Sequence, residues 1–255
     1  MQSRSLCLAR HSLKLYLSDP APLVVYLLMP LGLMAFMSPL SKALLHSQGY
    51  VNATGAEQAV PGMTIMFSFM MMSVVGIQFY REYGWGTWDR LRIASGGLSI
   101  IVGKILPGLL LLLGQIVVVF VAGGAFFGLH VTGSIAGLLV LFFAFAFCTT
   151  SLTMALIAWC RTLDQLMVIA NLVAMLFSGI GGSFAPVDSL PAWARKIAVA
   201  SPAYWAMKGM RGIILDGQRL GFSVRTAGAL VAFGVLFAFF AVIRFRMNEV
   251  KVSDT

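Results

Sequence analysis

Six long apolar stretches, separated by shorter polar segments, dominate the chain. A helix rises 1.5 Å per residue, so about 20 apolar residues cross the hydrocarbon core of a bilayer. The stretches lie at approximately residues 22–40, 60–79, 100–129, 133–159, 165–182 and 226–243. This pattern predicts an all-α polytopic membrane protein whose six transmembrane helices form one transmembrane domain, residues 1–255.

Shorter segments carry apolar residues on one face only. Residues 3–18 place leucines at helical spacing opposite basic residues, which is typical of a helix lying in the membrane interface. Residues 192–200 and 204–215, before the last span, predict two further short interfacial helices, with tryptophan and tyrosine at headgroup level. Residues 41–59 are polar and predict an outer loop between the first two spans.

Small residues near the third and fourth spans predict close helix packing. Gly124 and Gly128 end one span, and Gly133 and Gly137 begin the next. Small residues four apart let helices approach closely in lipid. Together they favour a tight hairpin between these two spans.

Composition agrees with a chain that lies mostly in lipid. Hydrophobic residues make up 59% and charged residues only 11%, against about 25% charged in soluble domains. The net charge of +9 is scattered between the spans and forms no single stripe, so we expect no nucleic-acid partner. The three cysteines contain no C-x-x-C pair, which argues against a disulfide framework or a metal site.

The basic residues act instead as topology signals. Those of the short loops favour a chain with both termini in the cytoplasm, in the plasma (cytoplasmic) membrane. The basic segment from Arg195 to Arg225 argues the other way, but longer segments count for less.

Energy-coupling chemistry is missing from the spans. None of the nine acidic residues lies inside a predicted span, whereas ion-coupled carriers place ionisable groups at mid-membrane. The chain also has no G-x-x-x-x-G-K-[ST] phosphate loop. We therefore expect no catalytic residue and no cofactor in this chain, and a transporter of this kind would depend on a partner for energy.

Residues 77–95, between the second and third spans, hold the densest patch of charge. They combine three arginines and two acids with two tryptophans, and the loop is longer than a simple turn requires. Either a docking helix for a partner or an interfacial anchor fits this composition.

Within that loop a motif resembles the ABC-2 type permeases of ATP-binding-cassette exporters. It consists of Arg81, Glu82, Gly86, Thr87, Trp88, Asp89, Arg90 and Leu91. A second family-like set follows the fifth span: Ser178, Gly179, Pro186, Leu190, Pro191, Trp193, Ser201, Pro202, Tyr204 and Arg211. The resemblance covers nearly the whole chain. One departure is Gly96-Gly97, where the family often has proline.

The resemblance implies that Arg81 to Leu91 form a coupling helix that docks on a separate P-loop ATPase, which would hold ATP and Mg. It also implies a dimer with a second copy or a paralogue, and a path lined by the second and fifth spans. Candidate lining residues are Met66, Phe67, Met70, Asn171, Met175 and Phe177. Methionine is adaptable and suits varied apolar ligands, but it also simply fills gaps in packing.

Together these features predict a permease subunit of an exporter, of the drug-resistance or antibiotic-efflux kind. It would move an amphipathic small molecule or a lipid. Two alternatives stay open: a non-transporting membrane scaffold, and a secondary carrier.

Overall fold

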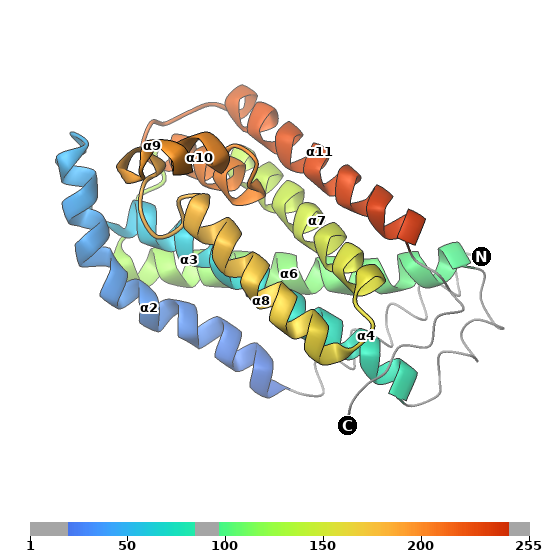
Figure 1. The fold of residues 1–255 in the computed structure, drawn as a ribbon. Helices are drawn as coiled ribbons and strands as arrows, with labels where there is room; N and C mark the ends of the chain where they lie inside the picture. Colours follow the sequence, from blue (N-terminus) through green and yellow to red (C-terminus); the bar gives the residue numbers. More distant parts are fainter. Residues whose placement is uncertain (1–19, 85–96, 245–255) are drawn as a thin grey trace.

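The computed structural model describes residues 20–84 and 97–244. In these two ranges the chain consists of helices and their connections, without a strand (Figure 1). Six spans are long and apolar enough to cross a membrane, which confirms the predicted all-α polytopic fold. The elements are α2 (Pro20–Ser47), α3 (Ala56–Met70), α4 (Met72–Gly84), α6 (Gly97–Phe127), α7 (Ile135–Trp159), α8 (Leu163–Ile180), the 3₁₀ turn η1 (Val187–Ser189), α9 (Ala192–Ala198), α10 (Pro202–Ile214) and α11 (Leu220–Arg244).

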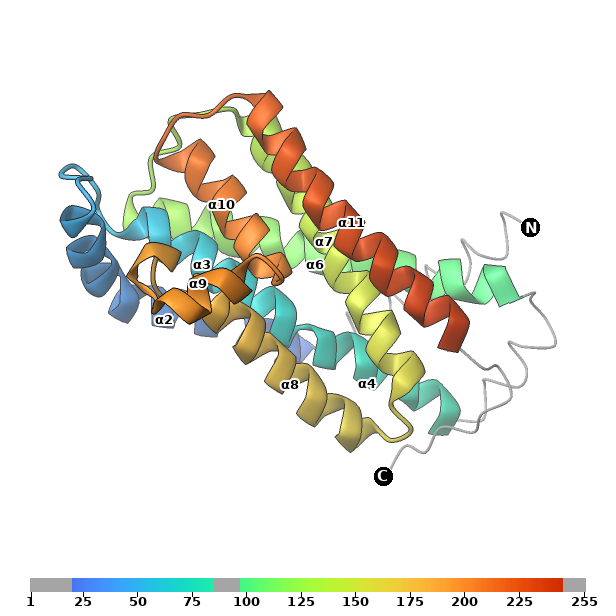
Figure 2. The same cartoon turned by 45° about the horizontal axis from the view of Figure 1, so that its top comes forward.

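The bundle has two ends with different contents. The last turn of α4, the α7–α8 turn and the last turn of α11 lie at one end, which we call the α4 end (Figures 1 and 2). The opposite α10 end holds the last turn of α2, the first turn of α3, and helices α9 and α10. Residues 3–18, predicted to form the N-terminal amphipathic helix, lie outside the described residues.

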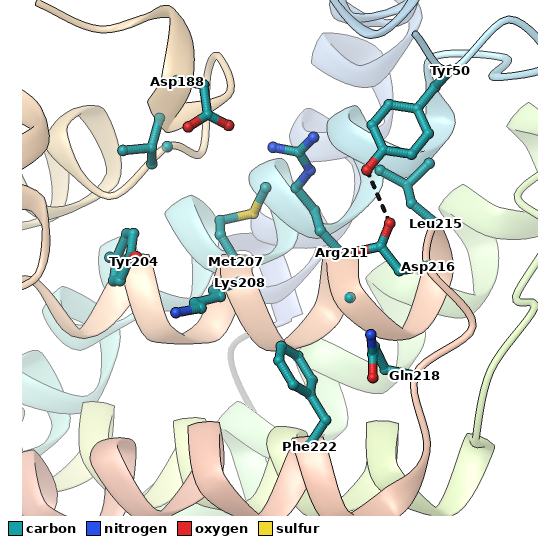
Figure 3. Close-up of a pocket in the computed structure, with 13 residues that line it drawn as sticks. Tyr50, Asp188, Tyr204, Met207, Lys208, Arg211, Leu215, Asp216, Gln218 and Phe222 are labelled. Atoms are coloured by element: carbon teal, nitrogen blue, oxygen red, sulfur yellow. Dashed lines mark hydrogen bonds between the residues drawn. The ribbon is translucent and has the colours of Figure 1, made fainter. Parts of the chain in front are cut away.

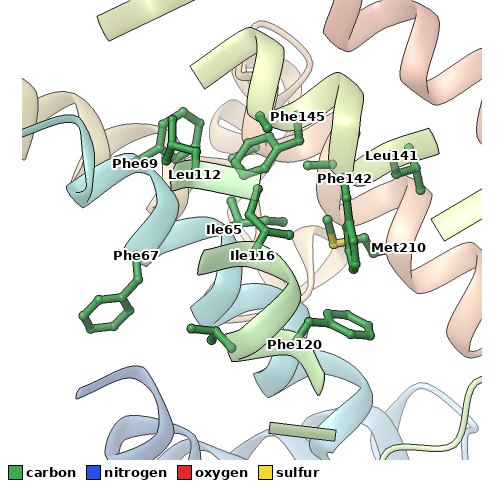
Figure 4. Close-up of a cluster of buried hydrophobic side chains, with 14 of the residues drawn as sticks. Ile65, Phe67, Phe69, Leu112, Ile116, Phe120, Leu141, Phe142, Phe145 and Met210 are labelled. Atoms are coloured by element: carbon green, nitrogen blue, oxygen red, sulfur yellow. The ribbon is translucent and has the colours of Figure 1, made fainter. Parts of the chain in front are cut away.

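Helices α3 and α4 together form the second span and occupy the centre of the bundle. The Met71 amide donates to the Phe67 carbonyl at 2.9 Å, so the helical path continues almost unbroken between them. Helix α3 packs on α2, α6, α8 and α10. The core around it contains edge-to-face aromatic pairs, with ring centroids 5.2 Å apart for Phe69 and Phe145 (Figure 4).

The polar segment after the first span is shorter than predicted. Helix α2 continues to Ser47, and α3 already begins at Ala56, so the loop is residues 48–55 rather than 41–59. Leu45 is fully buried, which holds the last turns of α2 against the bundle. At the start of α3, the Glu57 carboxylate accepts the amide of Gly55 at 2.9 Å. Glu57 lies in the first turn of this spanning helix, and Asp164 lies in the first turn of the spanning helix α8, so the prediction that every acid lies outside the spans is wrong for these two.

The two short helices before the last span differ from each other. Helix α9 is exposed at most positions, as a surface helix should be. Helix α10 was predicted at the interface but instead packs into the bundle, against α3, α7, α8 and α11. Ala203, Ala206, Gly209 and Gly212 are all buried on it. These small residues leave room for the neighbouring helices.

Close packing also differs from the predicted hairpin. A Cβ atom at Gly137 would overlap the side chain of Ser223 on α11, and one at Gly133 would approach the Ile213 carbonyl to 2.6 Å. Gly124 instead contacts only Leu129, at the end of its own helix. Helices α6 and α7 do pack on each other, but Gly133, just before α7, and Gly137, in its first turn, allow close contact with α10 and α11 rather than with α6.

Candidate functional site

The candidate path residues of the second span include the least buried positions of α3. Thirteen of its fifteen residues are buried, and Met66 and Met70 are the two that are not. They lie four residues apart and therefore share one face of the helix. Ile77 and Arg81 of α4 are also partly exposed and continue this spacing. A partly exposed stripe of Met66 and Met70 thus lies on α3, and beyond the buried Ser73 and Val74 the same face is partly exposed again on α4.

The two phenylalanines predicted with them occupy different surroundings. Phe67 is buried and points toward α2, where its ring centroid lies 6.4 Å from that of Tyr26 (Figure 4). Phe177 is half-buried and packs edge-on against Phe69 at 5.9 Å. Both side chains take part in packing within the chain in this structure.

On α8, one face packs and the other does not. The buried face is a four-residue repeat, Leu166, Ala170, Ala174 and Ser178, whose small members allow close approach to α3 and α4. Met175 lies outside this face and is 65% exposed. Asn171, one helical turn earlier, is partly exposed and makes no hydrogen bond within the described residues. An unbonded amide in a spanning helix is costly in lipid, so this face suits a further partner.

At the α4 end, α4 is fixed to the turn between α7 and α8. The Tyr80 hydroxyl donates to the Cys160 carbonyl at 2.9 Å, and both residues are buried. They form one apolar cluster with Phe79, Ile157 and Leu166. The hydrogen bond and the shared apolar cluster therefore connect the last turns of α4 to the α7–α8 turn.

The coupling residues begin where this cluster ends. Arg81 is partly exposed in the last turn of α4. Glu82 follows in the same helix, and its side chain is not described. Gly86, Thr87, Trp88, Asp89, Arg90 and Leu91 lie outside the described residues. Their docking role stays a prediction.

At the α10 end, the start of α3 and the start of α10 both contact the segment 177–183, which we call the junction. The sequence pattern did not predict these contacts. Gln58 of α3 donates from Nε2 to the Gly182 carbonyl at 2.7 Å. A Cβ atom at Gly62 would overlap the Ser183 carbonyl, so glycine is required for this contact. Ser201, at the start of α10, donates to the Phe177 carbonyl at 3.0 Å. The signal available in the sequence was a glutamine and a glycine on one face at the start of an apolar span.

Comparison with known proteins now gives this architecture a family. Residues 6–215 match the model of the ABC-2 type transporter family, and the chain belongs to that family. The matched range contains both family-like motifs found in the sequence. It follows that the chain carries the membrane domain of the ABC-2 type transporter family and is a multi-pass membrane protein.

Two curated relatives are similar to the chain. The linearmycin resistance permease protein LnrN of Bacillus subtilis (strain 168) is 25% identical over 185 residues, which cover 72% of this chain and 48% of the relative. ABC transporter G family member 20 of Dictyostelium discoideum is 28% identical over 216 residues, which cover 84% of this chain and 30% of the relative. The chain therefore spans about half the length of the first relative and less than a third of the length of the second.

Proposed function

We propose that this chain is the permease subunit of an ABC exporter that moves an amphipathic small molecule or lipid out across the cytoplasmic membrane. Both termini would lie in the cytoplasm, the α4 end would face the same side, and a separate P-loop ATPase would dock on Arg81 to Leu91. A curated relative named as a resistance permease supports cargo of the drug-like kind. ATP and Mg would be held by the partner.

The partly exposed stripe on α3 carries this proposal. A helix placed only for packing would bury all its faces at the centre of the bundle. Met66 and Met70 are instead partly exposed, although 83% of the most apolar window of this span is buried within the chain. Flexible thioether side chains can adapt to cargoes of different shape. They are therefore the first residues we expect an apolar cargo to touch.

The unpartnered face of α8 supports a second permease subunit. Only 22% of the corresponding window of α8 is buried within the chain. A second copy, or a paralogue, facing Asn171 and Met175 would bury this face and could supply a hydrogen-bond partner for the amide. The path would then lie between the two subunits, with α3 and α8 of each on its walls.

In this proposal, the contact between Tyr80 and Cys160 transmits a movement of the docked ATPase to the transmembrane helices. A force applied at Arg81 acts on the turn of α4 that contains Tyr80. The hydrogen bond and the surrounding apolar cluster pass the displacement to the start of α8. Because α8 carries Asn171 and Met175, the movement reaches the proposed path wall.

The docking role is tested with the ATPase itself. The purified chain is mixed with candidate P-loop ATPases, and complex formation and cargo-stimulated ATP turnover are measured. The double variant Arg90→Glu with Trp88→Ala should lose both. Arg219→Glu, an exposed charge at the α10 end, is the matched control and should keep both. Intact assembly and turnover in the double variant would show that the loop is not the coupling site.

A further inference from the structure

A cavity of about 410 Å³ opens at the α10 end (Figure 3). It lies between the 48–55 loop, η1, α10 and the start of α11. Its charged members are Asp188, Lys208, Arg211 and Asp216. Apolar side chains, including Val187, Met207, Leu215 and Phe222, form the rest of its wall. Neither the proposed path nor the coupling role uses this cavity.

Arg211 is the unusual group in it. Its guanidinium projects from α10 to a position between Tyr50 and Asp188 (Figure 3). Nη2 donates to Gln48 Oε1 at 3.1 Å, which is a neutral acceptor. Nε is buried and has no hydrogen-bond partner, and no ion pair to Arg211 occurs among the described residues. Arg211 as a whole is half-buried, and its guanidinium stays charged, so it is a cation without a directly paired counter-ion among the described residues.

The two carboxylates nearby do not fill that role. Asp188 and Asp216 are both exposed, so water solvates their charge. Asp216 accepts a hydrogen bond from the Tyr50 hydroxyl at 2.9 Å. Burial lowers the pKa of Arg211, while Tyr50, Asp188 and Asp216 act in the opposite direction. The aspartates therefore stabilise the guanidinium from a distance, and neither forms an ion pair with it.

A second cation of the cavity lies one helical turn earlier on α10. Lys208 precedes Arg211 by three residues, and its side chain extends toward Tyr204, whereas the Arg211 guanidinium extends toward Tyr50 and Asp188 (Figure 3). The Lys208 ammonium is exposed and lies 5.6 Å from the ring centroid of Tyr204 and 5.4 Å from that of Trp205. Met207 and Phe222 offer apolar surface next to the two cations. This combination fits a molecule with one anionic group and an apolar part.

We propose that this cavity binds the phosphate or carboxylate group of an amphipathic molecule. The anion would contact Arg211, the exposed Lys208 ammonium would attract it from the same cavity, and the apolar part would lie along Met207 and Phe222. Guanidinium can donate two parallel hydrogen bonds to a pair of carboxylate or phosphate oxygens, which explains the choice of class. The site does not depend on transport, because its residues lie at the α10 end, opposite the last turn of α4 that carries Arg81.

The test uses the full chain purified in an uncharged detergent and isothermal titration calorimetry. The probes are short-chain phosphatidic acid, the matching diacylglycerol without the phosphate, and inorganic phosphate. We expect saturable binding of phosphatidic acid and none of diacylglycerol. Saturable binding of inorganic phosphate as well would show that the free anion suffices. Binding of phosphatidic acid alone would show that a lipid-like molecule is the ligand.

Variants assign the binding to this cavity. Arg211→Gln should weaken phosphatidic acid binding roughly 10- to 100-fold, because a charge-assisted hydrogen bond is lost. Lys208→Gln should weaken it by a smaller factor. Arg219→Gln removes the same charge from an exposed position outside the cavity and should bind like the unaltered chain.

Two results would overturn the proposal. The first is equal binding of phosphatidic acid and diacylglycerol, or no saturable binding of any probe. The second is an unchanged affinity for phosphatidic acid in both Arg211→Gln and Lys208→Gln, equal to that of Arg219→Gln and the unaltered chain. If Arg211→Gln does not purify in folded form, Arg211→Lys replaces it, since lysine keeps the charge but loses the planar fork and should still bind more weakly.

Discussion

Changing Tyr80 to phenylalanine tests the connection between the coupling loop and the bundle. The substitution removes one hydroxyl and leaves the ring in the apolar cluster at the α4 end. The lost bond, from Tyr80 to the Cys160 carbonyl, is 2.9 Å long and buried. Leaving a buried acceptor without its donor costs about 1–3 kcal/mol. At about 2–4 °C per kcal/mol for a chain of this size, the apparent Tm should fall by roughly 2–12 °C.

Tyr26→Phe is the matched control. Tyr26 lies on α2 with its ring edge toward Phe67, and its hydroxyl makes no hydrogen bond within the described residues. The same chemical change there should shift the apparent Tm by much less. The assay is thermal unfolding of both variants in one detergent, followed by cargo-stimulated ATP turnover with the partner ATPase. We expect turnover to fall in Tyr80→Phe alone. Equal effects of the two changes on both measurements would refute the proposed link.

Three further predictions concern the junction, the dimer and the path. Gly62→Ala should lower stability by about 1–3 kcal/mol through overlap with backbone, whereas Gly32→Ala in α2, with open space around it, should be neutral or stabilising in the same thermal assay. Asn171→Leu should weaken dimerisation in liposomes roughly 3- to 20-fold, measured by energy transfer between labelled chains; unchanged transfer would contradict a role for the amide. Replacing Met66 and Met70 with alanine should reduce cargo-stimulated turnover while basal turnover persists, and loss of both together would point to misfolding instead.

The sequence was sufficient for the spans because lipid imposes a simple rule on them. Every backbone polar group must be satisfied within the segment, so a long apolar run in this chain is a helix. The family motifs were equally visible, because they are local. Span bounds were less certain: α2 extends to Ser47 because Leu45 is buried by tertiary contacts, which a local polarity average cannot show.

The position of α10 and the α10-end cavity could not be predicted for a related reason. An amphipathic helix next to a span has the same pattern whether its apolar face meets lipid or other helices. Arg211 belongs to a family-like motif, but its surroundings include Gln48, Tyr50 and Asp188, which come from the 48–55 loop and η1. Likewise, Gln58 bonds to Gly182, which is 124 positions away in the chain. Such long-range contacts leave no periodic signal.

Cargo movement into sealed vesicles tests the central proposal most directly. The chain and its partner ATPase are reconstituted so that the α4 end faces outward, and uptake of a fluorescent amphipathic cargo is followed. We predict uptake that requires ATP and both proteins, and that persists when an ionophore abolishes the proton gradient at constant ATP. Uptake that continues without the ATPase, or that collapses with the proton gradient, would contradict an ATP-driven exporter.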